Sequence, residues 1–143
     1  MGYAVFHKGE LIDWRIKAFR DKWSKKKQKK ILQAFAHVLN TYPIQTVISK
    51  EPHPTYCTKE VYQLINEIKA ITKKKGVSFI PYSLEKLDLS KNSSQKVGVI
   101  NLTLEKYPHL KRHCETERQT RAEYYIKMFE AIALIDGYYR NQG

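Results

Sequence analysis

Three glutamates stand at positions where acidic side chains are uncommon, and together they suggest metal-dependent chemistry. Glu51 directly follows the apolar segment 46–49, which has the composition of a buried strand. Glu130 interrupts the apolar run 126–135, and Glu123 lies two helical turns earlier on the same face. Hydrolysis of a phosphodiester is often performed by two divalent ions about 4 Å apart, held by carboxylates from separate elements. Because Mg²⁺ prefers oxygen ligands, these three acids are candidate ligands of Mg²⁺ or Mn²⁺.

Each of these acids also has an ordinary structural explanation. Glutamate is mostly exposed in folded proteins, so a solvated loop position accounts for Glu51 as well. Lys127 stands between Glu123 and Glu130, and a Glu–Lys ion pair at helical spacing accounts for that pattern. A metal site would further need an acid from a central strand. Asp13 belongs to a predicted hairpin, and nothing in the sequence directs it toward Glu51.

Two lysine clusters stand out in a basic chain. The 143 residues include 26 lysines and arginines against 14 acids, a formal net charge of +12. This excess favours a polyanionic partner such as nucleic acid or an acidic membrane surface, although a solvated lysine coat is the plain alternative. The clusters are Lys25, Lys26, Lys27, Lys29 and Lys30, and then Lys73, Lys74 and Lys75. We expect both to contact backbone phosphates, which give affinity without reading sequence.

The first predicted element is a β-hairpin. Segments 3–6 and 10–19 have the composition of strands, and Lys8-Gly9 is the turn between them. The second strand alternates between two sets of residues, and this period of two predicts that one face is buried. One set is Leu11, Asp13, Arg15 and Lys17, and the more apolar set is Ile12, Trp14, Ile16 and Ala18.

Helices and a parallel strand pair are predicted to follow. Ser24 is a plausible N-cap for a helix that carries the first lysine cluster in its opening turns. Cations oppose the helix dipole there, and this small cost indicates that the lysines have another use. Thr58 caps a second helix, which Gly76 ends. Strand 46–49, this helix and strand 77–80 form a βαβ unit with parallel strands. Pro81 closes the last strand, Ser83 caps a short helix, and longer helices are expected over 94–107 and 120–139.

Cysteine use and hydropathy favour a cytoplasmic protein. Two cysteines do not make a disulfide framework, which indicates a reducing compartment. No apolar run approaches the ~18 residues that a membrane span needs. The N-terminus lacks the pattern of a signal peptide. We therefore expect no membrane partner.

The ordered set of segments resembles the RuvC-type Holliday-junction resolvases, which have the RNase H-like fold. The resemblance covers nearly the whole chain, and no single motif in it is diagnostic. Its parts are a hairpin starting GYAVF, an acid after a strand in VISKEP, a long helix, a strand in VSFIPYS, and a final helix with MFEAIALI. It implies an α/β fold with a mixed sheet, antiparallel hairpin plus parallel strands, flanked by helices in one domain over 1–143.

The resemblance implies an activity and site residues. It implies a metal-dependent endonuclease acting on branched DNA during recombination, as a homodimer. Glu51 corresponds to the family's acid after its fourth strand, and Glu130 to the acid of its final helix, where Asp is usual. Glu123 matches a second helix acid more loosely. Lys127 stands where the family often has another acid, so it departs from the two-metal pattern and is expected to contact a phosphate.

The beginning of the chain gives a further expectation. The family's first strand carries an aspartate in a segment like Gly-Ile-Asp-Pro-Gly, before a strand like Gly-Tyr-Ala-Val. This chain opens at Met1-Gly2-Tyr3, so we expect the domain to be N-terminally incomplete. The strand either lies upstream or has been lost with its aspartate. Loss would leave a non-catalytic nucleic-acid-binding module that retains the RNase H-like fold; a structural partner in a larger complex is the third alternative.

Overall fold

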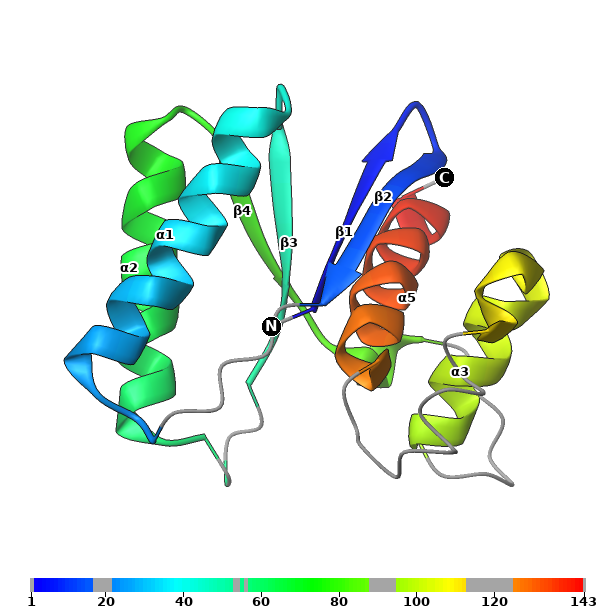
Figure 1. Cartoon of the computed structure of the whole chain (residues 1–143). Helices are drawn as coiled ribbons and strands as arrows, with labels where there is room; N and C mark the ends of the chain where they lie inside the picture. Colours follow the sequence, from blue (N-terminus) through cyan, green and yellow to red (C-terminus); the bar gives the residue numbers. More distant parts are fainter. Residues whose placement is uncertain are drawn as a thin grey trace. The chain divides into compact units, whose positions relative to one another are not determined.

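The computed structural model describes residues 2–16, 22–52, 55, 57–87, 95–112 and 125–142 (Figure 1). The chain divides into two compact units. Unit 1 comprises residues 1–18 and 82–143, and unit 2 comprises residues 19–81. Unit 2 is therefore one continuous stretch that interrupts the sequence of unit 1.

Unit 1 begins with the predicted hairpin. Strand β1 (Gly2–His7) pairs antiparallel with β2 (Glu10–Ile16). The turn residues Lys8 and Gly9 both have positive φ, 50° and 80°, as a tight two-residue hairpin turn requires. Glycine adopts this conformation without strain, so the predicted turn is confirmed.

The buried face of β2 differs from the prediction. Val5 pairs with Asp13, but Phe6 pairs with Leu11, so the register shifts by one residue and Ile12 is the extra residue of a bulge. Ile12 is 47% exposed as a result. The expectation that Ile12 shares a buried face with Trp14 is wrong, because a bulge moves the following residues to the other face of the strand.

Helix α5 (Tyr125–Gln142) forms the centre of unit 1. It packs against both strands of the hairpin and against α3 (Gln95–Lys106), as Figure 1 shows. Its Phe129 and Ile132 side chains are fully buried. Two short helices join this core, η1 (Leu84–Lys86), capped by Ser83 as predicted, and η2 (Pro108–Leu110).

Unit 2 contains the predicted βαβ unit. Strands β3 (Thr46–Lys50) and β4 (Ser78–Tyr82) form a parallel two-stranded sheet, with α2 (Lys59–Lys74) between them in sequence. Helix α1 (Lys25–Thr41) packs against α2. Pro81 lies inside β4 and does not close it, because a strand of a two-stranded sheet has a free edge where a missing N–H is tolerated.

The predicted helix boundaries in unit 2 are confirmed. The Ser24 hydroxyl accepts a hydrogen bond from the Lys27 N–H at 3.1 Å, and Thr58 caps α2 in the same way. Gly76 has φ +71°, the left-handed conformation that stops a helix.

The α/β class is confirmed, with an antiparallel hairpin, a parallel pair and flanking helices. Within the described residues the strands form two separate sheets of two strands each. Over the same ranges, none of the helices is both long and apolar enough to cross a membrane.

Candidate nucleic-acid interface

The positive charge of the chain is concentrated in unit 2. Residues 19–81 contain thirteen lysines and arginines and four acids, an excess of nine out of the chain's twelve. Unit 1 has thirteen basic and ten acidic residues. Any attraction to a polyanion should therefore act mainly through unit 2.

Helix α1 presents most of its lysines on one side. Four of the five are exposed, and the helical period places them together on the side opposite the buried Gln28 and Ile31. The four are Lys25, Lys26, Lys29 and Lys30. Helix α1 contains no acidic residue. Its N-terminal half is thus a cationic surface without a carboxylate of its own.

Gln28 interrupts the lysine run and sets the rotation of α1. Its Nε2 donates a hydrogen bond to Glu67 Oε2 of α2 at 2.7 Å. The one uncharged residue among the lysines is therefore the one that faces α2. It is in phase with Ile31 and Phe35, a sequence signal that was open to analysis and was missed.

Lys75, from the second lysine cluster, contacts the C-terminal end of the helix face that carries the four exposed lysines of α1. Gln33, His37 and Asn40 are exposed and continue the side that the four lysines occupy. Lys75, at the C-terminus of α2, donates a hydrogen bond from Nζ to Asn40 Oδ1. We call this surface the α1 face, consisting of Lys25, Lys26, Lys29, Lys30, Gln33, His37, Asn40 and Lys75.

The α1 face is long enough for an extended polyanion. At 1.5 Å per residue, the distance along the helix from Lys26 to Asn40 is about 21 Å. Duplex DNA rises about 3.4 Å per base pair, so this length equals about six base pairs. Lys73 and Lys74 are exposed in the last turn of α2, beside Lys75 in the sequence. The first cluster thus supplies cations at one end of the α1 face, and Lys75 of the second cluster supplies one at the other end.

Lys27 lies apart from the other lysines of its cluster. It is half-buried, and its Nζ is 5.8 Å from the centroid of the Trp23 ring. Trp23 directly precedes the N-cap of α1 and is 37% exposed. Trp23 was not among the predicted binding residues, although an aromatic residue next to a lysine run is a recognised signal of nucleic-acid binding.

The predicted acids lie in different units. Glu51 is exposed directly beyond the end of β3 in unit 2, which is the position the sequence indicated. Glu130 lies on α5 of unit 1 with its side chain 13% exposed, and Lys127 Nζ is 3.9 Å from its Oε1. The ion pair anticipated as the ordinary explanation is thus present, with Lys127 itself 58% exposed. Glu123 lies outside the described residues.

The described acids do not form a metal centre. In the ranges that the structure describes, no three His, Cys, Asp or Glu side chains gather in a way that could hold a metal ion. Bound Mg²⁺ or Mn²⁺ stays a prediction that needs further carboxylates.

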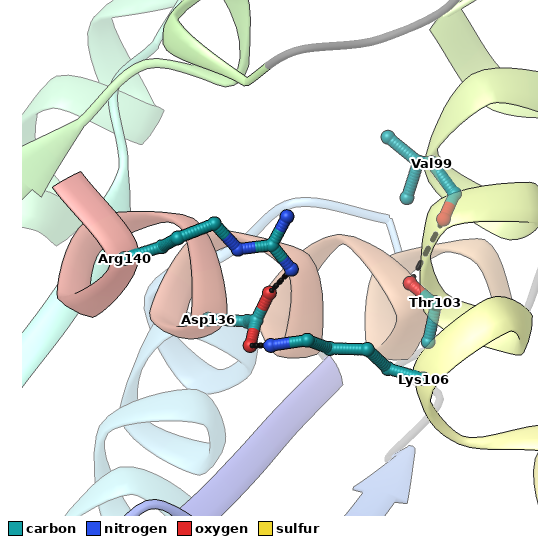
Figure 2. Close-up of polar contacts among 5 residues, drawn as sticks. All are labelled: Val99, Thr103, Lys106, Asp136 and Arg140. Atoms are coloured by element: carbon teal, nitrogen blue, oxygen red, sulfur yellow. Dashed lines mark hydrogen bonds and ion pairs between the residues drawn. The ribbon is translucent and has the colours of Figure 1, made fainter.

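In unit 1, two cations share one carboxylate (Figure 2). Asp136 of α5 is 12% exposed and accepts from Lys106 Nζ and from Arg140 Nη2, both at 2.6 Å. Beside it, the Thr103 hydroxyl donates to the Val99 carbonyl at 2.8 Å along α3. The Lys106–Asp136 ion pair joins α3 to α5, whereas the Arg140–Asp136 and Thr103–Val99 contacts each lie within one helix.

The same network affects Tyr107. Burial raises the pKa of Tyr107 above its ordinary value of 10.0, the charge of Asp136 raises it further, and Arg140 opposes both. Burial and Asp13 likewise raise the pKa of Tyr3 on the hairpin, against a smaller opposing effect of Arg15. Both shifts delay ionisation of the phenol to a higher pH than in an exposed tyrosine.

Comparisons with known proteins give no relative. No protein-family model, no curated protein and no solved structure matches the chain.

Proposed function

We propose that this chain is a cytoplasmic nucleic-acid-binding protein that binds the phosphate backbone through the α1 face. The observation that carries the proposal is the meeting of the two lysine clusters on one exposed helix face, through the contact of Lys75 with Asn40. The concentration of net positive charge in unit 2 supports it.

Physical reasons favour phosphate over other partners. Lysine ammonium groups act as point charges that bind phosphates without base recognition, and counterion release makes such binding strongly salt-dependent. Cations at the N-terminus of α1 lie against the helix dipole, and a bound anion would offset that unfavourable interaction. DNA is the partner we propose, with affinity that does not depend on sequence.

We also propose an RNase H-like arrangement for the fold. The order of a hairpin, a helix, a βαβ unit and a long final helix supports it. The fold would then serve as a scaffold for the α1 face whether or not a catalytic site is complete.

The test is a salt titration of DNA affinity with charge-matched variants. Lys26→Gln, Lys29→Gln and Lys30→Gln together remove three charges from the α1 face. Lys8→Gln, Lys86→Gln and Lys111→Gln remove three exposed charges from unit 1. Fluorescence anisotropy between about 50 and 200 mM salt gives the slope of log affinity against log salt.

The two triple variants should differ clearly. Each phosphate contact contributes about 0.7 to 0.9 to the salt slope, so the α1 variant should lower it by about 2 and weaken binding at least about tenfold. The unit 1 variant should change the salt slope and the affinity only slightly. If the two triple variants lose equal affinity, the binding depends on overall charge and not on the α1 face. If the unchanged protein binds DNA weakly and with little salt dependence, the structural-partner alternative is favoured.

A metal-dependent endonuclease of branched DNA, resembling a dimeric Holliday-junction resolvase, is the second candidate. The specific observation in its favour is Glu130, a carboxylate held largely out of solvent within an apolar helix. On this proposal Glu51→Gln and Glu130→Gln abolish cleavage of a four-way junction in Mg²⁺ or Mn²⁺ and leave binding intact. Glu105→Gln, an exposed site on α3, is the control. Absence of cleavage by the unchanged protein would leave the binding function alone.

A further inference from the structure

Trp23 is a large apolar side chain at the N-terminus of α1, next in sequence to the end of the helix that carries the four exposed lysines. It directly precedes the N-cap Ser24, with Lys22 on its other side in the sequence. Its exposed fraction of 37% is high for so large an aromatic residue. Trp14, by contrast, is half-buried in unit 1, with its ring centroid 5.2 Å from that of His109.

Lys27 holds the exposed indole in a defined place. Its ammonium lies 5.8 Å from the ring centroid, within the range of a cation–π contact. The backbone N–H of Lys27 is in turn held by the Ser24 hydroxyl at 3.1 Å. The indole is thus anchored to the capped first turn of α1, which lowers the entropy lost when a ligand stacks on it.

We propose that Trp23 stacks on an unpaired nucleobase, so that the α1 face takes single-stranded nucleic acid; this inference rests on the proposed function. Proteins that bind single-stranded nucleic acid combine lysines, which contact the phosphates, with an aromatic ring, which stacks on the bases. Bases inside a duplex are stacked on one another and cannot reach the indole. The exposed ring therefore selects unpaired bases, while the four lysines hold the backbone.

The test uses Trp23 as its own reporter. Trp14→Phe leaves Trp23 as the sole tryptophan of the chain. We expect short oligothymidylate and oligouridylate to quench its fluorescence and to bind more tightly than a duplex of equal length. If only one of the two single strands quenches the fluorescence, the ligand is assigned to DNA or to RNA accordingly. Quenching by either strand supports the proposal.

Substitution of the ring separates stacking from charge. Trp23→Ala should weaken single-strand binding by about 5- to 150-fold, since one base–aromatic stack contributes about 1 to 3 kcal/mol, and should leave duplex affinity nearly unchanged. Trp23→Phe should retain most of the affinity. Tyr62→Ala, at an exposed aromatic residue of α2, should have no effect. Circular dichroism would establish that each variant is folded.

Two results would overturn the inference in distinguishable ways. If Trp23→Ala binds single strands as well as the unchanged protein, or loses single-strand and duplex affinity equally, then stacking is refuted and the lysine surface still stands. If no nucleic acid binds with salt dependence, the proposed function itself fails.

Discussion

Reversing the charge at the start of α1 should stabilise the protein while weakening its binding to nucleic acid. The first turn of α1 contains lysines and no acid, so its cations lie against the positive end of the helix dipole. Lys25 and Lys26 also stand four residues before Lys29 and Lys30, which places like charges next to each other. The variant Lys25→Glu with Lys26→Glu changes the sign of both interactions.

The size of the effect follows from this geometry. An exposed charge beside a helix end changes the free energy of unfolding by about 0.3 kcal/mol. Replacing an unfavourable charge by a favourable one removes the first effect and adds the second, so the change is twice that amount. A pair four residues apart contributes about 0.2 kcal/mol, which reversal also counts twice, and glutamate before lysine is the favourable order. Each substitution should therefore raise the free energy of unfolding by about 1 kcal/mol, and both together by about 2 kcal/mol. For a chain of this size we expect Tm to rise by about 6 °C.

A charge-matched control lies at the end of α2. Lys73→Glu with Lys74→Glu makes the same change in net charge, but lysines in a last turn complement the helix dipole. This variant should lower the free energy of unfolding by about 1 kcal/mol. Thermal unfolding by circular dichroism measures both variants, and anisotropy should give weaker DNA binding for each. A fall in Tm for the α1 variant, or equal shifts in both, would refute the reasoning.

Three further predictions concern unit 1. Gly2→Ala should destabilise the protein by about 1 to 3 kcal/mol in chemical denaturation, because a Cβ would strike the backbone of Lys127 on α5; unchanged stability would contradict that close approach. Asp136→Asn should cost about 1 kcal/mol in the same assay, since two half-exposed cations lose their shared charged acceptor, and the loss should shrink in high salt. Tyr107 has a folded-state pKa above 10.0, so its contribution to stability is complete below about pH 10 and is lost as pH rises through the folded-state value. Tyr107→Phe should therefore flatten the decline of unfolding free energy above pH 10, and an identical decline would contradict the assignment.

The elements that sequence analysis predicted well are those specified by neighbouring residues. Ser24 and Thr58 cap their helices because a hydroxyl reaches an N–H three residues onward. Gly9 and Gly76 stand where the backbone needs positive φ. These features depend on contacts within a few positions, and no distant part of the chain has to be known.

The predictions that failed depended on distant partners. The alternation around Ile12 indicated a buried face, but the register against β1 puts a bulge there and leaves the side chain exposed. Pro81 ends a strand by local rules, yet it is tolerated in β4 because the sheet has only two strands. The Glu130–Lys127 ion pair, which was the ordinary alternative for that acid, did not depend on a distant partner, because the two residues are three positions apart on one helix.

The sequence by itself determined the excess of positive charge, its division into two lysine runs, and the helix that carries the first run. Only the tertiary structure decided that Lys75 of the second run contacts the helix that carries the first. The hydrogen bond from Gln28 to Glu67 turns the lysines of α1 away from α2, and Lys75 reaches Asn40 at the other end of the helix. Both contacts join residues more than thirty positions apart, so helical periodicity alone could not reveal them.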